Sequence, residues 1–180
     1  MIMLVLPDLV QEGDLLTAAQ RGDASAQREI YEQYFPPIYN FIRLRVNDLQ
    51  QAQDIAADVF LDFFIALKGQ RPPRKSLRAW LFRVARNKVY DHYGKRKQFP
   101  LTTLEDWVPA DRDAEPEAEF MRLHSVDRVR RVIGMLNAEQ QEVLILRFGQ
   151  TLSLQETADI MDKTVSAIKS LQFRATDRLR

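Results

Sequence analysis

Residues 153–180 read SLQETADIMDKTVSAIKSLQFRATDRLR, and this stretch decides how the end of the chain folds. Ser153, followed three residues later by Glu156, matches the capping-box pattern that starts a helix. Apolar spacing carries that helix to Met161, and a break at 162–164 precedes a second helix over 165–180. Two short helices joined by a tight turn predict a helix-turn-helix.

The residues around the predicted turn meet the packing needs of that motif. Ala158 is small enough for close helix approach, Asp162 tolerates a left-handed turn, and Ile168 packs the second helix on the first. Gly is the usual turn residue because it has no Cβ, and Asp is the second choice because its short side chain bonds locally. The shared core is filled by Met161, Val165 and Leu171.

The outward face of the last helix is rich in hydrogen-bond donors. Its polar residues are Ser166, Lys169, Ser170, Gln172 and Arg174. Such side chains suit phosphates and base edges in a DNA major groove, and the stretch 163–180 holds five basic residues and one acidic one. We therefore expect binding to duplex DNA. A helical hairpin with a generic polar surface is the alternative.

Composition limits the other functions that the chain could have. It has 180 residues and no cysteine, which excludes disulfides, thiolate metal sites and cysteine nucleophiles. No apolar run approaches the roughly 20 residues that span a bilayer. The apolar start, which begins at either Met1 or Met3, lacks a basic region and a small-residue cleavage site. We therefore expect a cytoplasmic protein without membrane insertion.

The formal net charge of +1 hides an uneven distribution. Residues 1–70 hold 5 basic and 10 acidic side chains, residues 71–97 hold 10 and 1, and residues 98–120 hold 1 and 7. The basic blocks on either side of an acidic one are candidate surfaces for a polyanion, although basic blocks are often only solvated helix faces.

Helical periodicity extends over most of the chain and predicts an all-α fold. The expected helices are 15–21, 24 onward, 49–68, 77–93, 117–136 and 138–148. Their expected caps are Asp14, Asp23, Asp48, Ser76 and the pair Asn137 and Gln140. Pro36 and Pro37 should kink or break the second helix. An acidic, proline-containing linker over 98–116 should separate two small helical domains, 1–97 and 117–180.

The helix over 77–93 mixes cations with aromatic residues. Exposed bases stack on aromatic side chains and phosphates pair with cations, so this composition suits single-stranded nucleic acid. Trp80, Phe82 and Val84 also fit a buried face, which is the alternative interpretation. Asn87 is polar and in mid-helix, so we expect it to be exposed and able to read a base edge.

With both blocks in place, the chain from about residue 14 to 180 resembles a bacterial RNA polymerase sigma factor of the small extracytoplasmic-function (ECF) type. In the first half the resemblance rests on GD at 22–23, YEQY at 31–34, QDIAADVFL at 53–61 and RAWLFRVARN at 78–87. In the second half it rests on QEVL at 141–144, LRF at 146–148, Ser153, ETA at 156–158 and AIKS at 167–170.

The resemblance implies a role for each part of the chain. Sigma region 2 would dock on the clamp of core RNA polymerase and open the promoter at its −10 element, and region 4 would read the −35 element. The clamp contacts would be Asp54, Ala57, Asp58 and Leu61. Residues holding the −10 element and its melted non-template strand would be Lys75, Arg78, Trp80, Arg83, Arg86, Asn87, Lys88 and Arg96. Those at the −35 duplex would be Ser153, Ser166, Lys169, Ser170, Gln172 and Arg174.

The resemblance also implies partners and limits. An anti-sigma factor is expected, the linker would thread the polymerase cleft, and no cofactor, metal or catalytic residue is expected. Four positions depart from the family pattern: Gln27, Ala57, Asn137 and Leu171 stand where Phe, Gln, Pro and Arg are usual. Leu171 should alter the −35 preference, and Ala57 should shift the clamp contact onto its neighbours. No fused sensor domain is expected after Arg180.

Two rival functions stay open at this point. Asp54, Asp58 and Asp62 fall on one helix face and could bind Mg²⁺ in an all-helical phosphohydrolase. The only histidines, His92 and His124, lie elsewhere in the sequence, and no phosphate-binding loop or nucleophile pair accompanies the carboxylates. The closer rival is a DNA-binding regulator that never joins the polymerase, because it would need only the helix-turn-helix.

Overall fold

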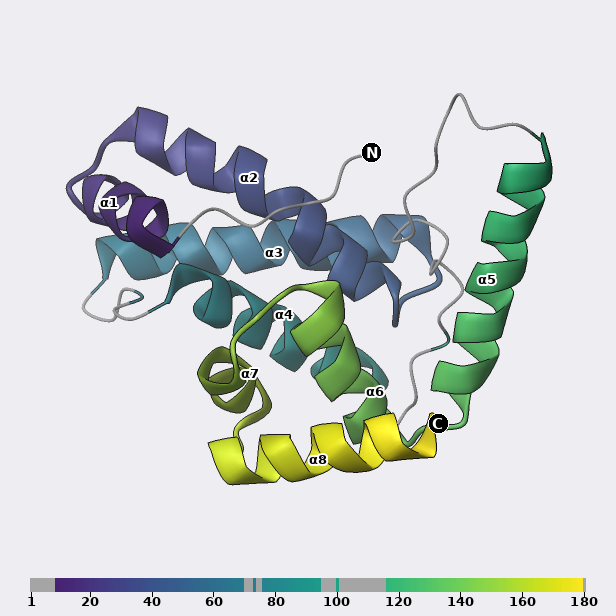
Figure 1. Ribbon diagram of the computed structural model, residues 1–180. Helices are drawn as coiled ribbons and strands as arrows, with labels where there is room; N and C mark the ends of the chain where they lie inside the picture. The colour runs from purple at the N-terminus through teal and green to yellow at the C-terminus, as the bar shows by residue number, and fades with distance from the viewer. Residues whose placement is uncertain (1–8, 70–72, 74–75, 95–99, 101–115, 180) are drawn as a thin grey trace.

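The computed structural model describes residues 9–69, 73, 76–94, 100 and 116–179, and every regular element in these ranges is helical (Figure 1). The all-α prediction is therefore confirmed. The elements are α1 (Leu9–Gln20), α2 (Ala24–Arg43), α3 (Leu49–Lys68), α4 (Leu77–Tyr93), α5 (Pro116–Gly134), α6 (Ala138–Leu144), the π-helical turn η2 (Ile145–Gly149), α7 (Leu154–Met161) and α8 (Val165–Arg178).

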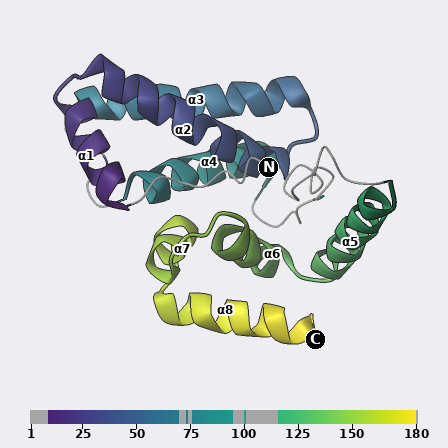
Figure 2. The same cartoon turned by 45° about the horizontal axis from the view of Figure 1, so that its top comes forward.

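The helices form two groups, with α5 to one side (Figure 2). We call α1–α4 the N-terminal bundle and α6, η2, α7 and α8 the C-terminal bundle. In the N-terminal bundle, apolar stripes with helical spacing turn inward from α2, α3 and α4. Fully buried members of these stripes include Ile30, Tyr34, Ile38, Phe63, Leu81 and Phe82.

The helix starts follow the predicted caps with one exception. Asp23, Asp48 and Ser76 each accept a hydrogen bond from a backbone N–H of the first turn that follows. The predicted cap at Asp14 is wrong, because α1 already begins at Leu9 and Asp14 lies inside it. The earlier start places Glu12 within the helix, where its side chain is buried.

Pro36 and Pro37 lie inside α2 without interrupting it, so the predicted break does not occur. Each proline removes one backbone donor and costs about 3 kcal/mol in a helix interior. Burial of Tyr34, Ile38 and Phe41 on either side of the pair offsets this cost, since each large apolar side chain contributes about 2 kcal/mol.

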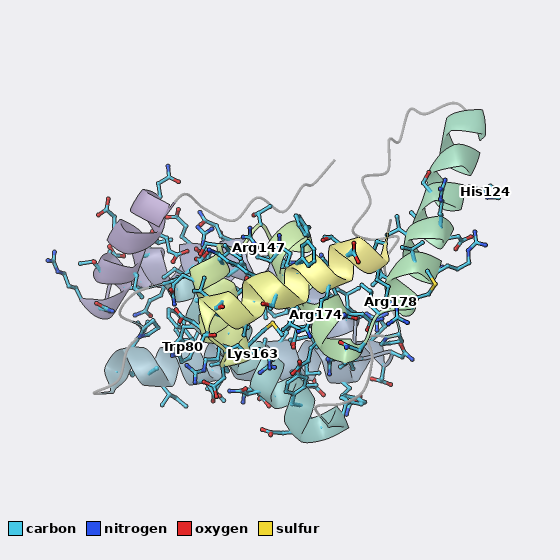
Figure 3. The ribbon with its side chains drawn as sticks, turned by 60° about the horizontal axis from the view of Figure 1, so that its bottom comes forward. Trp80, His124, Arg147, Lys163, Arg174 and Arg178 are labelled. Carbon is cyan, nitrogen blue, oxygen red and sulfur yellow. The ribbon has the colours of Figure 1, made fainter. Side chains whose placement is uncertain are left out.

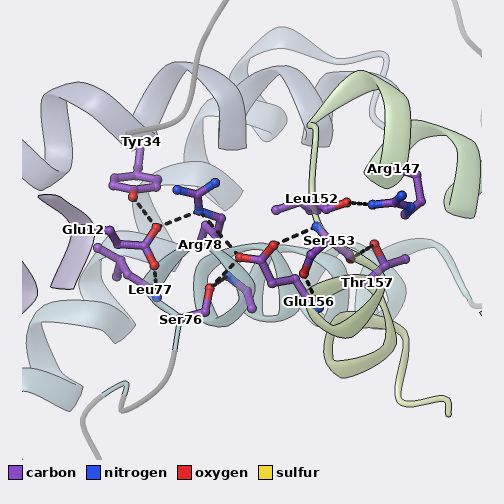
Figure 4. A network of polar contacts seen from close by, with 11 residues as sticks. Glu12, Tyr34, Ser76, Leu77, Arg78, Arg147, Leu152, Ser153, Glu156 and Thr157 are labelled. Carbon is purple, nitrogen blue, oxygen red and sulfur yellow. Dashed lines mark hydrogen bonds and ion pairs between the residues drawn. The ribbon is translucent and has the colours of Figure 1, made fainter. Parts of the chain in front are cut away.

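The buried carboxylate of Glu12 joins three elements of the N-terminal bundle (Figure 4). Its Oε2 accepts from the Tyr34 hydroxyl and from Arg78 Nε, both at 2.7 Å, and its Oε1 accepts from the Leu77 backbone N–H at 2.7 Å. Burial, together with the neighbouring Glu12 charge, raises the pKa of Tyr34 far above its usual value. The phenol therefore stays protonated as a donor.

The C-terminal bundle contains the predicted helix-turn-helix. Ser153 and Glu156 form the capping box of α7, and Asn137 and Gln140 form a second one at α6. Asp162 ends α7 in the left-handed conformation, with φ 55° and ψ 48°. The predicted motif core is mostly enclosed, since Ala158, Met161, Ile168 and Leu171 are buried and Val165 is half-buried.

The two bundles pack against each other through α4 and α7, which lie side by side. Glu156 spans this contact, because it accepts from Ser153 N at 2.8 Å in its own helix cap and from Ser76 Oγ at 3.0 Å in the cap of α4. Arg78 Nε lies 3.6 Å from the same carboxylate (Figure 4). In the described ranges, no helix is long and apolar enough to cross a bilayer.

Replacing Glu12 with Ala should lower the free energy of unfolding by about 3 kcal/mol, because it leaves the buried Arg78 guanidinium and Tyr34 hydroxyl short of their acceptor. Asp14→Ala is the matched control, since Asp14 is an exposed carboxylate on the same helix and its loss should change stability by less than about 0.5 kcal/mol. Urea denaturation followed by circular dichroism measures both, and equal effects would contradict the assigned role.

Replacement by Gly should be tolerated at the turn residue Asp162 but not at Asp159, which lies three residues earlier inside α7. Asp162→Gly should raise the free energy of unfolding by about 0.5 kcal/mol because it removes the left-handed penalty of a Cβ. Asp159→Gly, at an exposed position inside α7, should lower it by about 0.5–1 kcal/mol. Thermal unfolding compares the two variants, and the same sign at both positions would refute the turn geometry.

Candidate nucleic-acid interface

One face of α4 points away from the bundle core and carries part of the predicted −10 contacts. Arg83 and Asn87 are exposed one helical turn apart, as predicted for Asn87. Trp80, on the same side, is half-buried and packs edge-on against Phe63 with ring centres 5.9 Å apart. Lys88 is also half-buried, and its Nζ lies 2.8 Å from Asp62 on α3.

The other predicted −10 residues lie differently. Arg78 is buried against Glu12, so the structure gives it a role in the fold instead of an outward position. Burial lowers the pKa of Arg78, but the hydrogen bond and charge of Glu12 outweigh it and the net pKa is raised. Lys75 and Arg96 lie outside the described residues, as does nearly all of the predicted linker.

Arg86 faces the C-terminal bundle. Its Nε and Nη2 donate to Glu142 on α6, at 2.9 Å and 3.2 Å, and the Tyr90 hydroxyl donates to the same carboxylate at 2.7 Å. Glu142 is fully buried there. Burial and the charge of Glu142 raise the pKa of Tyr90 far above its usual value, so this hydroxyl also stays a donor.

The exposed face of α8 is a stripe with helical spacing that is polar apart from one phenylalanine. Its members are Ser166, Lys169, Ser170, Phe173, Arg174 and Asp177, all exposed. Figure 3 looks onto this helix, with Lys163 near its start and Arg174 and Arg178 along it. Ser153 is also exposed at the start of α7.

Gln172 does not belong to this outward stripe. It is half-buried and accepts from Arg147 Nε at 3.1 Å, while Arg147 also donates to the Leu152 carbonyl. Arg147 thereby ties the turn before α7 to the middle of α8. Lys163 is held as well, because its Nζ lies 2.9 Å from the Glu139 carboxylate of α6. These charged and amide contacts therefore hold α8, and the turn before it, against the rest of the C-terminal bundle.

The four predicted clamp residues share one exposed face of α3. Asp54, Ala57, Asp58 and Leu61 are all exposed, and Leu61 shows 56% of its surface. Ile65 extends the same face by one turn and is 60% exposed. A face with both carboxylates and large exposed apolar side chains is typical of a protein-binding surface.

The carboxylates of the rival metal site do not gather. Asp62 faces Lys88, whereas Asp54 and Asp58 are exposed to solvent. Within the part of the chain that the structure describes, no group of three or more His, Cys, Asp or Glu side chains is arranged to hold a metal ion.

Two residues of these surfaces, and one buried residue beside α4, were missed by the sequence reasoning. Phe173 and Ile65 follow from helical spacing, since each continues a stripe of predicted residues at i+3 or i+4. Glu142 had no such signal, because its partners Arg86 and Tyr90 lie more than 50 positions earlier in the chain.

Two family models match most of the N-terminal bundle and the whole C-terminal bundle. Sigma-70 region 2 matches residues 30–99, and Sigma-70 region 4 matches residues 132–180. The solved complex of the sigma factor RpoE with the anti-sigma factor NepR from Bartonella quintana shares the fold, with a TM-score of 0.58 at 22% identity over 84% of this chain and 92% of that one.

Two relatives extend the similarity over nearly the whole chain. The ECF RNA polymerase sigma factor BldN of Streptomyces coelicolor is 34% identical over 92% of this chain, which spans 63% of the length of BldN. The ECF RNA polymerase sigma factor SigD of Mycobacterium tuberculosis is 33% identical over 98% of this chain and 87% of SigD. The chain therefore belongs to the ECF family of RNA polymerase sigma factors.

Proposed function

We propose that this chain binds core RNA polymerase and directs initiation to promoters with −10 and −35 elements. The observation that carries the proposal is the exposed polar stripe of α8, presented by a complete helix-turn-helix, in a chain that also holds a region 2 bundle. Residues 1–97 would then act as region 2, residues 98–116 as the linker through the polymerase cleft, and residues 117–180 as region 4.

On this proposal α8 enters the major groove of the −35 duplex. Lys169, Ser170 and Arg174 contact base edges and phosphates, while Ser153 and Ser166 donate to the backbone near the helix starts. Phe173 adds an apolar contact suited to thymine methyl groups. Gln172 acts through Arg147 to orient the helix, since the two side chains are hydrogen-bonded.

The outward face of α4 holds the melted non-template strand at the −10 element. Arg83 and Lys88 supply positive charge, Asn87 reads a base edge, and the half-buried Trp80 offers a ring for stacking. Lys75 and Arg96 are proposed to extend the same positive surface at the two ends of the helix. Arg78 is left out of these contacts because it is committed to Glu12.

The exposed face of α3 docks on the polymerase clamp. Asp54 and Asp58 provide charge complementarity, while Ala57 and Leu61 provide apolar contact that Ile65 extends. Such a mixed patch fits a protein partner better than a metal ion, and on this proposal the chain acts as a non-enzymatic subunit of the polymerase.

The same proposal places the protein in the cytoplasm, where polymerase and DNA are found. RpoE, which shares this fold, is bound to an anti-sigma factor, and we propose that this chain is likewise controlled by such a factor. The test of the whole proposal is transcription by core polymerase plus this chain on genomic fragments. Promoter-specific starts are expected. DNA binding without core binding would instead favour a regulator that never joins the polymerase.

Replacing Arg174 with Ala should weaken binding to the −35 duplex about tenfold and reduce the salt dependence by about one released counterion if the contact is to phosphate. Fluorescence anisotropy across a salt series measures both quantities. Arg128→Ala is the matched control, because Arg128 is an exposed arginine on α5, away from the stripe. Equal losses in the two variants would indicate only non-specific charge attraction.

Replacing Leu61 with Ala should weaken binding to core polymerase about tenfold, since a large apolar side chain at the centre of an interface contributes about 1–2 kcal/mol. Leu49→Ala is the control, because Leu49 is similarly exposed at the start of the same helix. Titration of labelled variants with core polymerase gives the affinities. An unchanged affinity for Leu61→Ala would exclude this face as the clamp contact.

A further inference from the structure

The turn that connects η2 to α7 holds a threonine in a left-handed backbone conformation. Among the non-glycine residues that the structure describes, only Thr151 and Asp162 have a positive φ, of 53° and 55°. A short polar side chain such as that of Asp bonds locally and tolerates this region, whereas a β-branched side chain is crowded by its own backbone there. Thr151 is therefore strained in a way that Asp162 is not.

The hydrogen bonds of this turn explain why its backbone is left-handed. Leu152 N donates to Leu146 O at 3.1 Å. Gln150 N donates to Ile145 O at 3.0 Å. The residues on either side of Thr151 thus satisfy two carbonyls of η2, in the manner of a helix C-terminal cap that is usually completed by glycine. The turn needs the left-handed backbone, but it does not need a threonine side chain.

The hydroxyl of Thr151 makes no bond within the fold that would offset this strain. The structure describes five threonines, and in four of them the hydroxyl forms a hydrogen bond with the nearby backbone, namely Thr17, Thr157, Thr164 and Thr176. Thr151 is exposed, and its Oγ1 has no hydrogen-bond partner among the described residues. This hydroxyl is therefore available to a molecule outside the chain.

Thr151 points outward beside the helix that we propose to enter the major groove. The residues on either side of it are buried, whereas Thr151 itself is exposed. The Arg147 guanidinium donates both to the Leu152 carbonyl, as drawn in Figure 4, and to the Gln172 side chain on α8. Gln172 follows Lys169 by three residues, on the same flank of α8. The turn is thereby held beside the Lys169 edge of the exposed α8 stripe.

A residue in this place faces the sugar-phosphate backbone of a bound duplex. In a helix-turn-helix the second helix lies in the major groove while the first crosses the backbone. Thr151 comes just before α7, the first helix of the motif, and two residues before the exposed Ser153. Threonine hydroxyls are common donors to phosphate oxygens. A hydroxyl that a packed turn already holds in place loses little freedom on binding.

We propose that Thr151 is a further −35 contact, whose hydroxyl donates to one phosphate of the promoter duplex. Strained backbone of this kind is characteristic of functional sites, where the side chain has a use that the fold alone does not explain. The proposal rests on the proposed function, because it takes α8 as the helix that binds the −35 element. Unlike Lys169 and Arg174, Thr151 carries no charge, so its contact releases no counterion.

Three substitutions separate the hydroxyl from the strain. Thr151→Val keeps the branched shape, so the affinity of the full chain for a −35 duplex should fall about fivefold at an unchanged melting temperature. Thr151→Gly should lose the same affinity but raise the melting temperature by about 2–4 °C, because the strain is relieved. Thr151→Ser keeps the hydroxyl on a less crowded side chain and should retain the affinity.

Fluorescence anisotropy across a salt series measures these affinities, and calorimetry measures the melting temperatures. The salt dependence of Thr151→Val should match that of the original chain, whereas Arg174→Ala should release about one counterion fewer. Thr17→Val is the control, because Thr17 is exposed on α1 in the N-terminal bundle. When the duplex phosphates are replaced one at a time by neutral methylphosphonates, one position should weaken binding of the original chain but not of Thr151→Val.

The outcomes separate this contact from the proposed function. If Thr151→Val and Thr151→Gly bind the duplex like the original chain while Arg174→Ala binds it more weakly, the Thr151 contact is overturned and the −35 role of α8 stands. A reduced salt dependence in Thr151→Val would also overturn the contact, because a hydroxyl carries no charge. If Arg174→Ala and all three Thr151 variants bind like the original chain, the proposed role of α8 fails with it.

Discussion

Arg78 is a buried cation, and the need to pair its charge organises both bundles. A guanidinium in a low-dielectric interior is destabilising unless carboxylates surround it. Glu12 from α1 meets that need within the N-terminal bundle, and Glu156 approaches it from the C-terminal bundle. Because Glu12 also accepts from Leu77 N, the same charge fixes where α4 begins. The orientation of the other side chains of α4 follows from this start.

That orientation divides α4 into two polar faces with different surroundings. Arg83 and Asn87 point to solvent, whereas Arg86 and Tyr90, three residues further along, point to α6. A rotation of about 100° per residue puts residues three apart about 60° from alignment, enough for one pair to face a partner domain and the other to face solvent. One side of this basic helix can therefore contact DNA, whereas the other side is already paired with Glu142 of the same chain.

Local features of this fold could be predicted from sequence, whereas directions of long polar side chains could not. Capping at Asp48, Ser76 and Ser153 depends on residues within one turn, so a short window is sufficient. The left-handed Asp162 follows in the same way from turn chemistry. The continuity of α2 through Pro36 depended on tertiary burial, which outweighs local propensity. In the sequence, Arg78 and Arg83 look equivalent within one basic block. Only the earlier start of α1 shows that Glu12 is available to pair with a buried Arg78.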